Sequence, residues 1–189
     1  VYMLLVNVLS GQAQGWDYFA HLTAGLFTFY LISGCMSTGA ASVVGGGRLL
    51  MNTAFPRLLL PLSAVRTAFY RYLPTLPVFA VFYMLAPRHL FTWKTLLSVV
   101  FLAMIVVFSA GLAAIFATAQ VYFRDTASFL PYFIRIWLYL SPVIFTVEQL
   151  RHHAGGYARV LYLNPLYSLL GGFTDLLVRS EMPSLTMWL

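Results

Sequence analysis

Three arginines lie in otherwise apolar sequence, and they have the clearest capacity for chemistry in this chain. Arg66 and Arg71 fall within the apolar stretch 61–86, and Arg135 falls within 129–147. A guanidinium group is costly inside a bilayer, so such residues usually face a polar partner or water. The alternatives are that their side chains extend to the membrane surface, or that the helix begins after Arg66. At helical spacing, the face with Arg66 and Arg71 also carries Ser63, Thr67, Tyr70 and Pro74.

Aromatic side chains around Arg135 form a second candidate group. Tyr132 and Tyr139 share a helical face with Arg135, and Trp137 lies two residues away. Planar rings of this kind can stack on sugar rings, although interfacial aromatic belts and ordinary packing use the same residues. Pro142 is expected to kink this helix. Its apolar side is expected to contain Phe129, Phe133, Ile136, Trp137 and Leu140.

Catalytic and metal-binding patterns are weak in this sequence. Glu148, His152 and His153 have no third ligand at metal-site spacing, and adjacent histidines point apart on a helix. No serine sits in a GxSxG turn, and the five acids are dispersed. The triplet Gly45–Gly47 lacks the Lys-Ser/Thr pair of a phosphate-binding loop. We therefore expect no enzymatic activity, no metal site and no cofactor in this chain.

Composition places the chain in a membrane. Hydrophobic residues make up 61% of it and charged residues only 8%, whereas soluble domains carry about 25% charged residues. The net charge of +6 comes from scattered basic residues, which excludes a nucleic-acid-binding stripe. The single cysteine, Cys35, excludes an intrachain disulfide. The expected fold is an all-α integral membrane protein.

The elements that position these residues are a series of membrane helices. A bilayer core needs about 20 apolar helical residues, and we expect spans at 18–44, 61–86, 95–119 and 129–147. A polar turn is expected at 11–17, and two short re-entrant helices at 148–177. Rows of small residues at four-residue spacing predict close helix contacts: Ser33, Ser37 and Ala41; Gly34, Thr38 and Ser42; Ala110, Ala114 and Thr118.

The two ends of the sequence resemble interrupted spans. Residues 1–9 are too short to cross a bilayer, and an apolar segment begins after Pro183. We therefore expect residues 1–189 to form a single transmembrane domain that is a portion of a longer chain. A full subunit would contain five to six transmembrane helices.

Four short pieces, in order, carry a family resemblance. They are Phe55-Pro56-Arg57 before Pro61, Arg124-Asp125, Ser141-Pro142-Val143 and Asn164-Pro165-Leu166. Together they resemble the permease subunits of bacterial polysaccharide exporters in the type-2 ABC transporter family. The resemblance runs through essentially the whole chain. The sequence of residues 124–143 is most similar to that of the actinobacterial galactan exporters.

The resemblance implies a six-span, multi-pass permease of the bacterial cytoplasmic membrane. Such a permease forms a homodimer and works with two copies of an ATP-binding subunit, which holds the ATP and magnesium. Its substrate is a lipid-linked glycan, and its other neighbours are membrane lipids rather than nucleic acid. The missing parts would be an N-terminal interfacial helix, most of the first span and the last span.

The resemblance assigns a role to one turn, and the positions of the arginines and aromatic residues in the sequence suggest a second role. The turn carrying Arg48, Asn52, Phe55, Pro56 and Arg57 would dock on the ATPase. The expected substrate pathway contains Arg66, Tyr70, Arg71, Tyr132, Arg135, Trp137 and Tyr139. Among these, the arginines would contact a diphosphate, because arginine donates to phosphate oxygens in pairs.

Other functions fit parts of the sequence. An exporter of teichoic acid, drugs or other small molecules would share the same pieces. A membrane glycosyltransferase would need more acidic residues than this chain has. A passive channel would leave the turn at 48–61 without a role.

Overall fold

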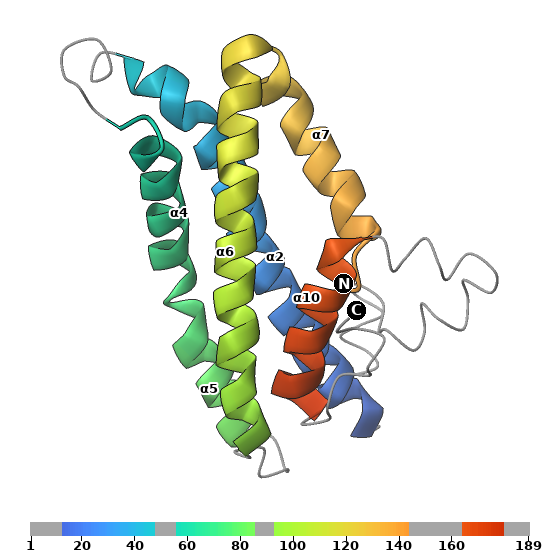
Figure 1. The fold of residues 1–189 in the computed structure, drawn as a ribbon. Helices are drawn as coiled ribbons and strands as arrows, with labels where there is room; N and C mark the ends of the chain where they lie inside the picture. Colours follow the sequence, from blue (N-terminus) through green and yellow to red (C-terminus); the bar gives the residue numbers. More distant parts are fainter. Residues whose placement is uncertain (1–12, 48–55, 86–92, 144–163, 180–189) are drawn as a thin grey trace.

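Helices are the only regular secondary structure among the described residues. The computed structural model describes residues 13–47, 56–85, 93–143 and 164–179 (Figure 1). The helices are α2 (Ala13–Gly45), α4 (Leu59–Tyr72), α5 (Thr75–Leu85), α6 (Trp93–Tyr122), α7 (Thr126–Tyr139) and α10 (Pro165–Thr174), followed by the π-helical turn η2 (Asp175–Arg179). No strand occurs in these ranges, so the prediction of an all-α fold is confirmed.

Two helices are long and apolar enough to cross a bilayer. The qualifying segments are Ala20–Gly45 of α2 and Leu96–Tyr122 of α6, with 26 and 27 residues. At about 1.5 Å per residue each reaches roughly 40 Å, more than the ~30 Å hydrocarbon core. The predicted spans at 18–44 and 95–119 therefore exist as helices. The predicted turn at 11–17 is wrong from Ala13 onward, because α2 has already begun there.

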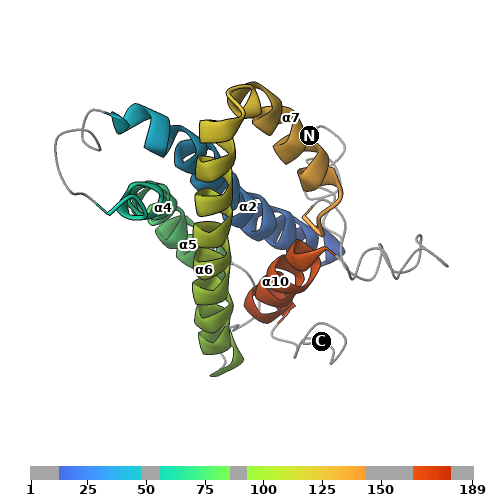
Figure 2. The ribbon, with the colours of Figure 1, turned by 45° about the horizontal axis from the view of Figure 1, so that its top comes forward.

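The α2–α6 pair forms the centre of the fold, and α4 packs on both helices (Figure 2). In α6 the buried row of small residues is Ser109, Ala113 and Ala117. The predicted row lies one position later and is buried only in part: Ala110 packs against the core, whereas Thr118 is exposed. In α2, Ser37 and Ala41 are also exposed, and the buried small residue opposite α6 is Gly39.

The predicted third span, 61–86, is interrupted between α4 and α5. Pro74 has no N–H group to donate to the preceding turn, which ends α4. At the break, the Leu73 N–H donates to the Phe69 carbonyl at 3.0 Å, and the Leu76 N–H donates to the Leu73 carbonyl at 3.1 Å. The Thr75 hydroxyl donates to the Tyr72 carbonyl at 2.7 Å. The span is therefore two shorter helices.

The helix predicted at 129–147 is shorter and begins earlier. α7 has 14 residues, about 21 Å of helix, and is too short to cross a bilayer alone. Pro142 does not kink a continuing helix; it lies beyond the end of α7 in the buried segment 141–143. The first part of the predicted re-entrant region, 148–163, lies outside the described residues.

Candidate functional site

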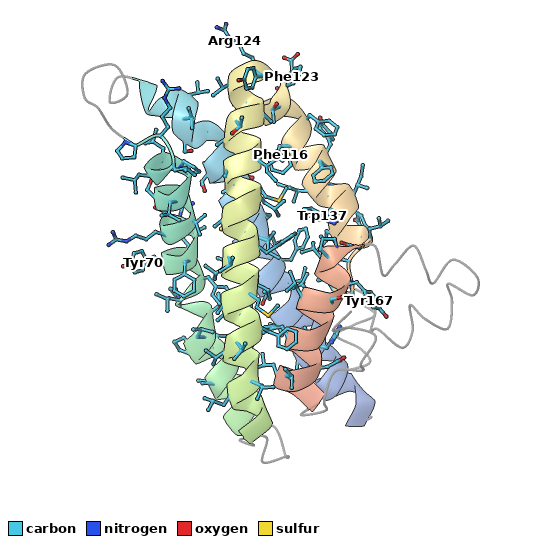
Figure 3. The ribbon with its side chains drawn as sticks, viewed as in Figure 1. Tyr70, Phe116, Phe123, Arg124, Trp137 and Tyr167 are labelled. Atoms are coloured by element: carbon cyan, nitrogen blue, oxygen red, sulfur yellow. The ribbon has the colours of Figure 1, made fainter. Side chains whose placement is uncertain are left out.

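One face of α4 carries the predicted polar residues. Arg66, Tyr70 and Arg71 are exposed, and Ala64, Val65 and Ala68 are buried on the other side. The Arg66 guanidinium carbon lies 5.4 Å from the centre of the Tyr70 ring. Its Nη2 atom also donates to the Tyr70 hydroxyl at 3.4 Å. Tyr70 is 54% exposed and points away from the other helices (Figure 3).

The exposed face of α7 carries the second predicted group. Tyr132 and Tyr139 are 65% and 62% exposed, and Arg135 between them is also exposed. The predicted division of this helix is wrong, because Ile136 and Leu140 lie on the exposed side as well. The packed side consists of Leu130, Phe133, Ile134, Trp137 and Leu138.

Trp137 has contacts of its own within the fold. It is half-buried, and its ring lies 5.3 Å from that of Phe133. The Phe133 ring lies in turn 5.9 Å from that of Phe116 in α6. The Trp137 indole N–H donates to the Asn164 side-chain oxygen at 3.0 Å. Trp137 therefore belongs to the packed side of α7, away from Arg135 and Tyr139.

The two exposed groups do not meet within one copy of the chain. The helices α4 and α7 lie on opposite sides of α6 in both views (Figures 1 and 2). Arg66, Tyr70 and Arg71 thus form one polar face, and Tyr132, Arg135 and Tyr139 form another. A pathway that used both faces would need a further surface to connect them.

Arg124 and Asp125 form an exposed turn between α6 and α7. The Gln120 amide donates to the Arg124 carbonyl at 3.0 Å. The Asp125 carbonyl accepts from the N–H groups of Ser128 and Phe129 at 3.0 and 3.1 Å. The backbone of this pair therefore shapes the turn, and both charged side chains point outward at the end of the α6–α7 hairpin, where Figure 3 labels Arg124.

Three curated relatives cover most of the chain. Two are O-antigen export system permease proteins RfbA of Klebsiella pneumoniae, 25% and 24% identical over 88% of this chain and 63% of their own length. The third is the protein of the same name from Myxococcus xanthus, 26% identical over 97% of this chain and 69% of its own length. The predicted resemblance to type-2 ABC permeases is confirmed.

These polysaccharide-export permeases match this chain along a part of their length. The chain spans 63% of the length of the two Klebsiella relatives. No family model matches it. The printed names describe permeases of an export system, which fits a transporter rather than an enzyme.

The predicted docking turn is described only at its end. Arg48, Asn52 and Phe55 lie outside the described residues. Pro56 and Arg57 are exposed, and their carbonyls accept from the N–H groups of Leu59 and Leu60 at 3.0 and 3.3 Å. The exposed pair therefore leads directly into α4, which carries the first polar face.

The Asn-Pro piece of the permease pattern begins α10. The side-chain oxygen of Asn164 accepts from the Leu166 N–H at 3.1 Å, and Pro165 takes the first helical position. Both choices favour a helix start, because an N-cap side chain satisfies a free N–H and proline has none to satisfy. The bond from Asn164 to Trp137 was not predicted. The only sequence signal for it is an amide with spare hydrogen-bonding capacity.

The potential metal ligands of the chain lie partly within the described ranges. Within the described ranges, no three His, Cys, Asp or Glu side chains gather into a group that could hold a metal ion. Glu148, His152 and His153 lie outside those ranges. The expectation of no metal site stays a prediction.

Proposed function

We propose that this chain is the membrane-spanning subunit of an ATP-driven exporter that moves a lipid-linked polysaccharide, of O-antigen or galactan type, across the bacterial cytoplasmic membrane. The observation that carries the proposal is the similarity to three O-antigen export permeases over 88–97% of the chain. Two membrane-length helices and two exposed polar faces support it.

The proposed assembly contains two permease copies and two ATPase subunits. The chain has one lysine, Lys94, and no phosphate-binding loop around it, so ATP and magnesium would bind to the partner. A second permease copy would also supply a surface opposite an exposed polar face of the first. The pathway would then lie between subunits, since the two faces of one copy do not meet.

In the proposed mechanism, movement of the ATPase pair is transmitted through the turn that ends at Arg57. This turn continues into α4, so a displacement there would shift Arg66 and Arg71. These two arginines and Arg135 would bind the anionic diphosphate, because a guanidinium donates to two phosphate oxygens at once. Tyr132 and Tyr139 would stack on sugar rings as the glycan passes.

The test begins with the full-length protein purified from its native membrane. A stoichiometric partner with a phosphate-binding loop and ATPase activity is expected. After reconstitution, lipid-linked glycan should stimulate that ATPase and be transferred across the vesicle membrane. Purification without a nucleotide-binding partner would contradict the ABC permease assignment. Stimulation by small hydrophobic compounds, with no response to lipid-linked glycan, would contradict the substrate class.

A further inference from the structure

Asn164 joins α7 to α10 through three hydrogen bonds. Its side-chain oxygen accepts from the Trp137 indole N–H at 3.0 Å and from the Leu166 N–H at 3.1 Å. Its side-chain nitrogen donates to the Leu140 carbonyl at 3.0 Å. One amide therefore caps the start of α10 and holds two groups at the end of α7.

Both helices are also attached to the central α2–α6 pair near this joint. Beyond α7, Val143 is fully buried, and a Cβ atom on Gly25 of α2 would lie 3.4 Å from its Cα. In α10, Gly172 lies so close to α6 that a Cβ atom there would overlap the ring of Phe101. Asn164 thus connects the end of α7 to a helix that is firmly packed on the core.

The bond to Trp137 restricts rotation of α7 about its own axis. Successive residues of an α-helix are about 100° apart. Trp137 faces the core, whereas Arg135 and Tyr139, two residues away on either side, are exposed. A rotation by one residue would turn part of the exposed face toward the core. The Trp137 ring is held against Phe133, so the bond of its N–H to Asn164 favours one rotational setting of α7.

We propose that Asn164 is a positioning residue for transport: it sets the rotation of α7 so that Arg135 and Tyr139 face the translocated glycan. This inference rests on the proposed function. A residue that only capped α10 would need the bond to Leu166 alone. The bonds to Trp137 and Leu140 have no part in capping and act on α7.

Two variants separate positioning from capping. Asn164→Ser keeps a side-chain oxygen for the N-cap but is too short to hold Trp137 and Leu140. Trp137→Phe keeps an aromatic ring on Phe133 and removes the indole N–H. Each is made in the full-length protein, reconstituted with its ATPase. Rotation of α7 is measured as the distance between spin labels at Ile136 and Val107, both exposed, in a background in which Cys35 is replaced by alanine.

Both variants are expected to broaden or shift the spin-label distance and to lower the glycan export rate. For Trp137→Phe the expected loss is about 2- to 12-fold, the range for one hydrogen bond, and for Asn164→Ser, which loses two, it is larger. Both variants remove the same bond to Trp137. The fold-reduction in export rate of the double variant should therefore be clearly smaller than the product of the two single fold-reductions. Asn164→Ser keeps the N-cap oxygen, so it should still fold, with a thermal midpoint lowered only by the loss of its two hydrogen bonds to α7. Unchanged distances, or changed distances with normal export, would overturn the inference.

Failure of the proposed function gives a different pattern. If the parent protein exports no lipid-linked glycan, the proposed function is wrong, and the spin-label distances still report whether Asn164 sets the rotation of α7. If Asn164→Ser does not fold, Trp137→Phe alone decides the inference by the same two measurements.

Discussion

Gly39 of α2 lies directly against Ala113 of α6, where the two central helices pack closely. A Cβ atom on Gly39 would lie 2.7 Å from the Cβ of Ala113 and 2.8 Å from its Cα. Real Cβ atoms do not come this close to other heavy atoms. In a membrane, helices associate largely through such close packing, because lipid is as apolar as the helix surface it replaces. The spacing of the central pair therefore depends on glycine at this position.

Replacing Gly39 by alanine should destabilise the protein. The new methyl group must push α2 and α6 apart, and overpacking of this kind costs about 1–3 kcal/mol. The measurement is the thermal midpoint in detergent, followed with a thiol-reactive dye that reports exposure of the buried Cys35. Gly111→Ala is the matched control, because no atom lies within 4 Å of a Cβ at that position of α6. Equal midpoints for the two variants would contradict the close crossing.

Removing the Thr75 hydroxyl should also destabilise the fold. The Leu76 N–H donates to the Leu73 carbonyl, so the Tyr72 carbonyl depends on Thr75 at the break between α4 and α5. A carbonyl left without a partner costs about 1–3 kcal/mol. Thr75→Val should therefore lower the thermal midpoint measurably.

Thr67→Val is the control for this effect. The Thr67 hydroxyl donates to the Ser63 carbonyl inside the regular helix α4, where the backbone supplies a second donor. The change should leave the thermal midpoint close to that of the parent. If Thr67→Val lowered the thermal midpoint as much as Thr75→Val, the Thr75 hydroxyl would not contribute more at the helix break than a hydroxyl inside a regular helix.

The sequence predicted helices and polar faces better than it predicted packing partners. The charge-free stretch 95–119 and the shared face of Arg66 and Arg71 follow from apolar length and from 3.6-residue periodicity, which are local properties. The buried row that begins at Ser109 and the less buried row that ends at Thr118 both contain small residues at four-residue spacing. Spacing alone cannot distinguish them, because lipid and a neighbouring helix are both apolar surroundings.

Two further features, the helix break at Pro74 and the hydrogen bond between Trp137 and Asn164, were not predicted, for different physical reasons. Pro74 lacks an N–H group, and this local property favours the break that ends α4, which the apolar length of 61–86 alone does not predict. The bond between Trp137 and Asn164 joins residues 27 positions apart. Such a contact depends on how α7 and α10 pack against α2 and α6, and no local pattern encodes it.

The exposed surface of α6 can be tested for contact with lipid by an inserted charge. Val107 is 73% exposed near the middle of this apolar helix. An arginine at the centre of a spanning helix costs about 2.5–3.5 kcal/mol in insertion experiments, so Val107→Arg should reduce the inserted fraction. Val121→Arg, near the end of α6, is the control, because arginine can reach the membrane surface from there. Equal insertion of both variants would contradict the assignment of α6 as a span.

The exposed arginines provide the most direct test of the two polar faces. Arg66→Gln, Arg71→Gln and Arg135→Gln should each weaken the apparent affinity for lipid-linked glycan. Loss of one charge-assisted hydrogen bond, about 1.5–3 kcal/mol, corresponds to roughly 10- to 150-fold. The measurement is ATP-dependent transfer of the glycan in vesicles over a range of substrate concentrations, with the amount of co-purified ATPase determined in parallel.

Charge and geometry can be separated at the same positions. The corresponding lysine variants keep the positive charge but lose the paired donors of the guanidinium. Their apparent affinity for lipid-linked glycan should therefore lie between those of the parent protein and the glutamine variants. Thr67→Ala, on the exposed face of α4, should transport normally, since its hydroxyl bonds only to its own helix. Because α4 and α7 lie on opposite sides of α6, an effect confined to Arg135 would restrict the pathway to the α7 face. The glutamine variants should still co-purify with the ATPase. Normal export by all three would exclude both faces as diphosphate sites.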